Sequence, residues 1–375
     1  DIMIYLDYNA TTPVDKKVLE TFNKVCINYP GNSNSLHKLG IKSKELEDYA
    51  TEKIAQMLNI KPQDIIYTSG ASESNNTAIK GICSKYKNRG KHIITTMLEH
   101  SSVSSTIKYL TNNGFEVDYI KIKDNGLVDI DHLKTLLRDD TILVSISYVD
   151  SEIGLKQPIE EIGKLLKEYP KCYFHVDCTQ ALGKVPIDFT NIDLASASAH
   201  KIFGLKGIGL LIKKENIQIE PLIHGGKSTT IYRSGTPALP LIVSLMKALE
   251  LILGNIQENY NHVLALNKEI TTTLSKYNNI TINSTPHSIP YTINFSVKGI
   301  KPETLLHALD QKEIYISTKS ACSSQNTMSS SIYALTKDRE RATTSLRISL
   351  SKLTTPEEIQ DFLHIFAEEL EKLTF

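Results

Sequence analysis

"DLASASAHKIFGLKGIGLLIK", residues 193–213, decides the fold that we predict. Its two apolar segments, 193–199 and 207–213, have the small and branched residues of short buried strands, and a glycine-rich turn separates them. Lys201 follows the first segment, where a lysine among serines and alanines has no obvious packing role. Burial would lower its pKa, and a neutral amine can form a Schiff base. Considered alone, Lys201 is better explained as a surface lysine in a turn.

Further strand-like segments precede this stretch, and helical patterns separate most of them. We predict short buried strands at 64–69, 92–96, 115–122, 141–147 and 172–177. Helical patterns occupy 72–86, 100–112, 129–138 and 158–169. This alternation predicts an α/β fold in which a mostly parallel sheet has helices on both faces.

The last third of the chain reads as a smaller α+β domain. A long helical stretch begins near residue 240, and a second set of strands and helices ends in an amphipathic helix at 355–373. We predict a large cofactor-binding domain at 15–256 and a small domain made of 1–14 and 257–375. Segment 317–331 is rich in serine and threonine without apolar periodicity, which predicts an exposed, mobile loop.

Composition limits the classes of function. The chain has 375 residues, of which 41% are hydrophobic and 22% charged, as in soluble globular proteins. The 42 basic residues balance the 42 acidic ones, so we expect neither nucleic acid nor a membrane as a main partner. Five scattered cysteines do not indicate a disulfide framework and favour a reducing, cytoplasmic location.

Ligands of open parallel sheets bind outside the carboxyl ends of the strands. Ala71 and Ser72 follow the strand at 64–69 and open a helix, where free amides can bind a phosphate. His100 follows the strand at 92–96 at another helix start, where the helix dipole favours a neutral imidazole. Considered alone, the first feature is better explained as an ordinary helix cap, and the second as a structural histidine.

An acidic residue closes the segment "CYFHVDCTQ". A buried carboxylate such as Asp177 needs a partner, because an unpaired one is costly. Strand alternation places His175 and Asp177 on one face and Cys172 and Cys178 on the other, so we expect no metal site here. The glycine spacing of 193–213 matches neither the dinucleotide fingerprint nor the P-loop.

Two more residues have reactive side chains in suggestive places. Cys322 lies in the polar loop beside serine and alanine, with Lys319 nearby, and such a thiol can be reactive although most free cysteines are inert. Arg347 lies in a strand-like pattern and either makes a structural ion pair or clamps a substrate carboxylate. A phosphate nest, a neutral histidine, an acid and a lysine are together the parts that a pyridoxal-phosphate (PLP) site needs.

At these residues the sequence resembles the cysteine desulfurases, a branch of the fold-type I PLP enzymes with class V aminotransferase topology. The resemblance runs nearly end to end, and it is carried by "YLDYNATTPVD", "GNSNSLHKLG", "TSGASESNNTAIKG", "EHSSV", "VDCTQALGKVPID", "SASAHKIFGLKGIG", "HGGKSTTIYRSGT", "SACSS" and "LRISLSKLTT". It implies a fold-type I PLP-dependent transferase that takes sulfur from L-cysteine and leaves L-alanine. The motif "SACSS" resembles that of the desulfurase subgroup with the longer catalytic loop.

The resemblance also implies roles for the residues nearest the chemistry. Lys201 would carry PLP and move protons, and Asp177 would pair with the ring nitrogen. His100 would stack on the ring, and Gln180 would bond to its phenolate oxygen. Cys322 would receive the sulfur as a persulfide.

Other implied roles concern the phosphate, the substrate and the partners. The phosphate would be held by Ala71, Ser72, Ser198 and His200, together with Thr236 from the other subunit of a homodimer. Arg347 and Asn32 would orient the substrate carboxylate. The sulfur acceptor would be an iron–sulfur scaffold protein or a tRNA-thiolation enzyme.

The sequence departs from the family pattern at Asp150-Ser151-Glu152, where the family usually has Asn-Asn-Glu. Ser151 is shorter than asparagine, so its cofactor contact would be lost or bridged by water. Two alternatives remain: another PLP enzyme on this scaffold, such as an aminotransferase or a selenocysteine lyase, or a non-catalytic sulfur-relay subunit. A transaminase needs no thiol, and the complete set of site residues argues against a subunit without activity.

Overall fold

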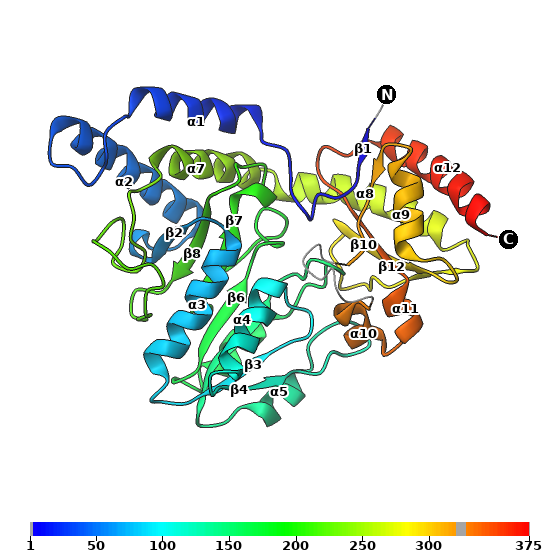
Figure 1. The fold of residues 1–375 in the computed structure, drawn as a ribbon, viewed down its shortest axis with the longest axis horizontal. Coiled ribbons are helices and arrows are strands. Elements are labelled where there is room, and N and C mark those ends of the chain that lie inside the picture. Colours follow the sequence, from blue (N-terminus) through cyan, green and yellow to red (C-terminus); the bar gives the residue numbers. More distant parts are fainter. Residues whose placement is uncertain (1–2, 320–327, 375) are drawn as a thin grey trace.

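The computed structural model describes residues 3–319 and 328–374, and its largest sheet has seven strands in the order β2-β8-β7-β6-β5-β3-β4 (Figure 1). The strands span Ile65–Thr68 (β2), His92–Thr95 (β3), Glu116–Tyr119 (β4), Thr141–Ser147 (β5), Tyr173–Asp177 (β6), Leu194–Ser198 (β7) and Gly209–Lys213 (β8). All seven predicted strands are therefore present, and the predicted α/β fold class is confirmed.

Two details of the sheet differ from the expectation or go beyond it. Among the seven described strands of this sheet, β8 alone runs antiparallel to its neighbours, because the short turn after β7 returns the chain beside it. We expected every strand to be buried, which is wrong for β4: its four residues are partly or fully exposed. β4 is an edge strand that pairs with β3 alone, so one side of it faces solvent.

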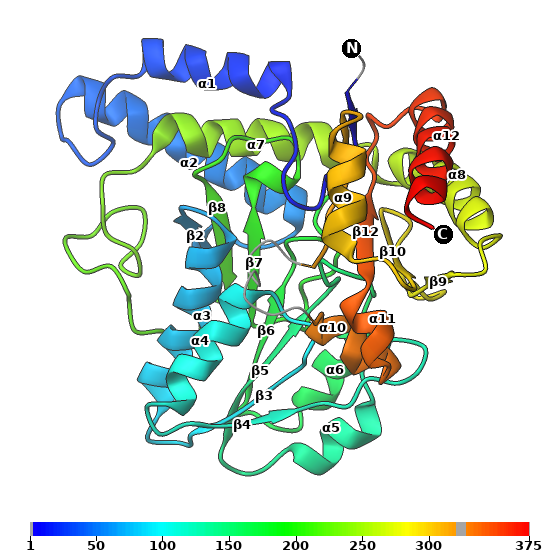
Figure 2. The same ribbon diagram turned by 45° about the vertical axis from the view of Figure 1, so that its right-hand side comes forward.

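Helices cover both faces of the sheet, as predicted. Ile66 and Ile93 point to the face covered by α3 and α4, whereas Tyr67 and Ile94 point to the face where α2, α6 and α7 pack. Figure 2 shows α3 and α4 side by side in front of the sheet. The helices span Lys16–Asn28 (α1), Lys38–Leu58 (α2), Ala71–Tyr86 (α3), Ser101–Thr111 (α4), Ile130–Leu136 (α5), Ile159–Leu166 (α6) and Leu239–Leu253 (α7).

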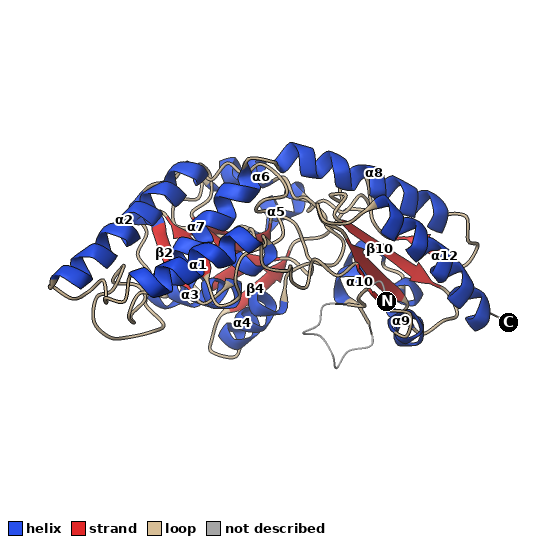
Figure 3. Ribbon diagram, turned by 90° about the horizontal axis from the view of Figure 1, so that it is seen from above, coloured by secondary structure: helices blue, strands red, loops and turns tan. Residues whose placement is uncertain are grey.

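A second, antiparallel sheet in the order β12-β10-β9 lies beside the large one (Figure 3). Its strands are Ile280–Ile282 (β9), Thr292–Val297 (β10) and Ser345–Ser349 (β12). The helices of this part are Ile256–Leu274 (α8), Pro302–Asp310 (α9), Ser330–Thr336 (α10), Arg339–Thr343 (α11) and Pro356–Leu373 (α12). Phe295 of β10 packs edge-on against Phe366 of α12, which joins helix and sheet in one apolar core.

The start of the chain belongs spatially to this second part. β1 (Ile4–Tyr5) pairs in parallel with β11 (Ile314–Tyr315), and Asp7 forms a bridge with Ser349. The domain boundary at residues 256 and 257 falls at the first turn of α8 and stays a prediction. No single helix of the described chain is long and apolar enough to cross a membrane; the bent pair α7–α8 qualifies jointly, by length and composition alone.

The expectation of an exposed loop at 317–331 is wrong at its C-terminal end. Ser329 and Ser331 are buried, and α10 begins at Ser330. The Ser329 hydroxyl caps α10 and donates to the Glu152 carboxylate at 2.5 Å. Serines that cap a helix give no apolar periodicity, so this helix start reads as loop in the sequence. Residues 320–327, with Cys322, lie outside the described residues.

Candidate active site

A cavity of about 460 Å³ opens at the carboxyl ends of the parallel strands. It collects side chains that follow five different strands of the large sheet, and Arg347 reaches it from β12. Among the predicted site residues it is lined by Ala71, Ser72, His100, Ser151, Asp177, Gln180, Ser198, His200, Lys201 and Arg347. The fold therefore brings together groups that are far apart in the sequence.

Two of the described site residues, Asn32 and Thr236, do not line this cavity. Cys322 lies outside the described residues. Asn32 is exposed, and its side-chain oxygen accepts the Asn34 amide at 2.9 Å. Thr236 lines a smaller cavity of about 80 Å³, which shares Ser69 with the large one. A role for Asn32 or Thr236 stays a prediction.

Asp177 ends β6 and is held by three donors. Its Oδ1 accepts the Thr179 hydroxyl at 2.6 Å and the Thr179 amide at 3.1 Å, and its Oδ2 accepts Asn75 Nδ2 at 3.1 Å. The carboxyl is buried, so these bonds replace the water that it loses. The held carboxylate is thereby fixed at the end of β6, where it can accept a hydrogen bond from a protonated ring nitrogen.

His100 caps α4 with its imidazole. Its Nδ1 accepts the Ser102 amide at 3.1 Å, so the ring proton of the neutral form is on Nε2. Burial lowers the pKa of His100, and the charge of Lys201 lowers it further, against the opposite effect of Asp177. The imidazole is therefore neutral near pH 7, as the sequence predicts.

The wall of the cavity at the start of α3 has the features of a phosphate cradle. Gly70 caps α3 without a side-chain hydrogen bond, so the first helical amides have no partner within the helix. Ser198 Oγ is buried and has no hydrogen-bond partner among the described residues. At Gly209 a Cβ atom would lie 2.7 Å from Gly70 Cα, so only glycine lets β8 approach the α3 start this closely.

Lys201 ends the short helical turn after β7 and reaches toward the start of the chain. Its Nζ donates to the carbonyl oxygens of Asn9 and Ala10, the latter at 2.8 Å. Two main-chain oxygens thus hold the amine at the cavity wall. Sequence reasoning missed Asn9 and Ala10, because they lie almost two hundred residues before Lys201 along the chain.

Arg347 is buried and only partly paired. Its Nη2 donates to Asp7 at 2.9 Å and its Nη1 to the Ser151 carbonyl at 3.0 Å. Its Nε has no hydrogen-bond partner among the described residues, although it is buried. A guanidinium in a cavity with an unused N–H suits a small carboxylate ligand.

Sequence reasoning also missed three supporting residues. Asn75, one turn into α3, bridges Asp177 and Ser102, and a helical period from Ala71 would have placed it on the cavity side. Thr179 shows the common pattern of a hydroxyl two residues after an aspartate. Burial and the nearby charge of Asp177 raise the pKa of Glu99 to about 8, so this carboxyl is mostly neutral at pH 7.

Comparison with known proteins identifies the family. The model of the family Aminotransferase class-V matches residues 4–362. The chain is 40% identical to the NifS/IcsS protein homolog of Lactobacillus delbrueckii subsp. bulgaricus, over 98% of this chain and 97% of that protein. It is 40% identical to cysteine desulfurase IscS of Methanosarcina thermophila, over 99% of this chain and 92% of that protein. The chain belongs to the cysteine desulfurases of aminotransferase class V.

Solved structures agree with this placement of the cysteine desulfurase. A NifS-like protein, 35% identical, superposes with a TM-score of 0.93 over 99% of this chain and 100% of that one. SspA in complex with cysteine, 33% identical, superposes with a TM-score of 0.81 over 94% of this chain and 99% of that one. The predicted family, fold class and PLP dependence are thereby confirmed, and the unpaired Ser198 hydroxyl and the donor-held Asp177 carboxylate fit that cofactor.

The role of Asp177 in this desulfurase can be tested by substitution. Asp177→Asn keeps the shape but removes the charge, so kcat should fall about 10²- to 10⁴-fold, as for other groups that control a proton. Steady-state rates at saturating cysteine measure this fall. Asp193→Asn is the matched control, since Asp193 is also partly buried and accepts the Phe174 amide at the other end of the sheet. Equal rates for Asp177→Asn and wild type would contradict the assignment.

Proposed function

We propose that this chain removes the sulfur atom of L-cysteine, releases L-alanine and stores the sulfur as a persulfide on Cys322. The observation that carries the proposal is the joint placement of Lys201, Asp177 and Arg347 around one cavity of about 460 Å³. An amine, a carboxylate and a guanidinium in this arrangement match an aldehyde cofactor, its ring nitrogen and an amino-acid carboxylate. Bound PLP would supply an electron sink for the bonds at the substrate Cα.

The residues of the chain divide the remaining work. Arg347 binds the substrate carboxylate through its unused Nε–H and so orients Cα. Lys201, once its amine is released by the incoming substrate, takes the Cα proton as a general base. Asp177 keeps a proton on the ring nitrogen. His100, neutral near pH 7, can donate the proton on its Nε2 and take one back at the same atom as the substrate reacts.

Sulfur transfer completes the reaction. The thiolate of Cys322 attacks the substrate sulfur; the new sulfur–sulfur bond forms as the bond from Cβ to sulfur breaks. The bonding electrons stay with the carbon, which gains a proton and leaves as alanine. A thiol of ordinary pKa, about 8.5, is only a few per cent thiolate at pH 7, so neighbouring cations would favour the reactive form.

The assembly and the surroundings are part of the proposal. We propose a homodimer, supported by exposed apolar side chains on α2, just before α2 and on the segment before α7, namely Leu36, Leu39, Ile41, Leu222, Ile223 and Ile231. Thr236 of one subunit would then complete the phosphate cradle of the other. The sulfur acceptor would be an iron–sulfur scaffold or a tRNA-thiolation enzyme in the cytoplasm.

A product assay tests the proposed activity. The protein, supplied with PLP, L-cysteine and a thiol reductant, should form alanine and sulfide in equal amounts. A new amino acid made from an added keto acid would instead indicate an aminotransferase. Turnover of selenocysteine without turnover of cysteine would indicate a selenocysteine lyase. If none of these substrates gave a product, the chain would be a non-catalytic subunit.

The role of Arg347 predicts a separate kinetic effect. Arg347→Lys keeps the positive charge but loses the forked donor, so the KM for cysteine should rise about 10- to 100-fold, the value of one charged hydrogen bond. The kcat should change less, because the groups at Cα remain in place. Initial rates over a range of cysteine concentrations separate the two constants. An unchanged KM would contradict the carboxylate clamp.

A further inference from the structure

A buried lysine outside the cavity contacts the residues that line it. Lys184 lies in the turn region after β6, and its Nζ donates to Gln180 Oε1 at 2.8 Å and to Asn9 Oδ1 at 3.2 Å. Its amine also lies 5.4 Å from the centre of the Tyr291 ring. Among the described residues Lys184 forms no ion pair with a carboxylate. A buried amine without a counter-ion is costly, so its retention needs a reason.

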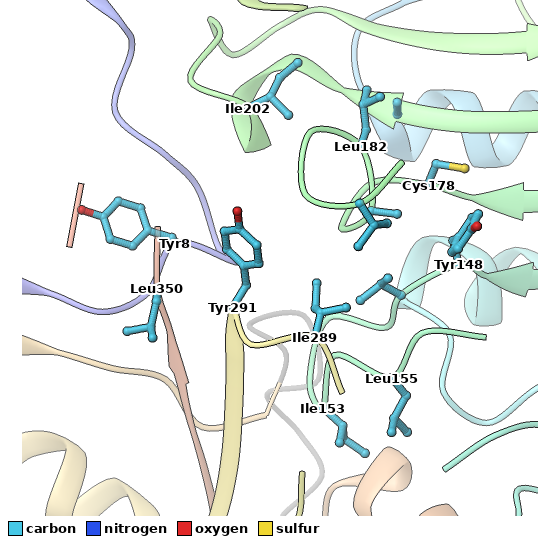
Figure 4. Packing of buried hydrophobic residues seen from close by; sticks show 14 of the residues in the cluster. Tyr8, Tyr148, Ile153, Leu155, Cys178, Leu182, Ile202, Ile289, Tyr291 and Leu350 are labelled. Carbon is cyan, nitrogen blue, oxygen red and sulfur yellow. The ribbon is translucent and has the colours of Figure 1, made fainter. Parts of the chain in front are cut away.

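Lys184 lines a different cavity from the one that holds most of the predicted site residues. It lines a small, mostly apolar cavity together with Leu182 and Tyr291, whereas Gln180 lines the large cavity. Figure 4 shows buried apolar side chains from several segments meeting in this region, these two among them. Burial, together with the nearby charges of Lys201 and Arg347, lowers the pKa of Lys184 to about 7. Lys184 is not among the residues that line the large cavity, so any effect of its amine on the site passes through its neighbours.

The contacts of Gln180 determine which way its amide faces. Its Oε1 accepts from Lys184, and its Nε2 donates to the Asn9 carbonyl at 3.0 Å. A rotated amide would present its NH₂ group to the amine and its oxygen to a carbonyl, which is unfavourable on both sides. The second N–H of Nε2 is left for the large cavity that Gln180 lines.

The same network reaches the catalytic lysine. The Asn9 carbonyl that accepts from Gln180 also accepts from Lys201 Nζ. The Asn9 side chain is fixed by Lys184 on one side and by Ser151 on the other, since its Nδ2 donates to the Ser151 carbonyl at 3.0 Å. One buried amine thus holds two amides, each of which contacts a residue of the site.

We propose that Lys184 is a positioning residue: it holds the Gln180 amide so that an N–H donor, and not an oxygen, faces the cofactor. This inference rests on the proposed function and on the role that the family resemblance implies for Gln180, a hydrogen bond to an oxygen of the cofactor ring. Lys184 touches neither cofactor nor substrate and works through Gln180.

A double-mutant cycle tests the proposal by the absorbance of the bound cofactor. The measured quantity is the pH at the midpoint of its spectral change. Lys184→Met should move this midpoint by about one pH unit in the same direction as Gln180→Leu, the effect of losing one hydrogen bond. In the Gln180→Leu background Lys184→Met should move it by less than a third of that, because the residue through which it acts is already gone.

The cycle has defined controls and contrary outcomes. Lys213→Met removes another buried lysine that donates to two carbonyls at the far end of β8, and it should leave the midpoint unchanged. Lys184→Leu replaces Lys184→Met if the latter does not fold. An unmoved midpoint in Lys184→Met, or an equal shift in both backgrounds, would overturn the proposal. A wild-type protein without a visible cofactor band would instead overturn the proposed function.

Discussion

Lys201→Ala should lower kcat for sulfur release by about 10³-fold or more, because the substitution removes both the anchor of the cofactor and the base at Cα. The side chain ends at the cavity wall, held by the Asn9 and Ala10 carbonyls. Among the described residues, no other lysine both lines this cavity and donates to the main-chain carbonyl of Asn9. Stopped assays of alanine and sulfide, with PLP in excess, measure the fall.

The matched control for this prediction is Lys206→Ala. Lys206 lines the same cavity but lies in the turn between β7 and β8, beyond the helical turn that carries Lys201. Its loss should change kcat by less than about tenfold, the effect expected for a peripheral charge. If Lys201→Ala and Lys206→Ala lose activity equally, the amine of residue 201 has no special role.

Cys322→Ser should reduce sulfide release about 100-fold or more while the visible band of the bound cofactor stays, since a hydroxyl does not accept a sulfur atom as a thiolate does. The residue lies outside the described part of the chain, so the prediction rests on the sequence resemblance and on the other thiols. Burial raises the pKa of Cys83, Cys172 and Cys178, which makes these thiols poor nucleophiles at pH 7.

Cys26 provides the matched control for this second prediction. It is an exposed thiol on α1, and it does not line the cavity of about 460 Å³. Cys26→Ser should release sulfide at the wild-type rate. Mass spectrometry after a single addition of cysteine, without reductant, should find one extra sulfur atom on the peptide that contains Cys322. Full activity of Cys322→Ser would disprove the nucleophile assignment.

The sequence predicted the part of the site that depends on strand ends. Lys201, Asp177, His100 and Ser198 each follow or close a strand of the large sheet, and parallel strands end at the same edge. Their convergence therefore follows from the order of strands and helices alone. The direction of β8 does not, since an apolar strand pattern is the same for parallel and antiparallel neighbours.

Contacts between distant segments escaped the sequence reasoning. Asp7 and Asn9 reach the site because β1 pairs with β11, more than three hundred residues later. The hydrogen bond from Arg347 to Asp7 depends on that pairing, and the sequence around neither residue predicts it. Lys184 likewise reads as an ordinary lysine in a turn, since its burial depends on Tyr291 from another part of the chain.

Locating the covalent attachment of PLP tests the central claim most directly. Borohydride converts the link between a lysine amine and the cofactor aldehyde into a stable amine, and peptide mass spectrometry then identifies the labelled residue. We expect the label on Lys201 and on no other lysine. A label on Lys184 or Lys206, or a protein that takes up no label after incubation with PLP, would contradict the account.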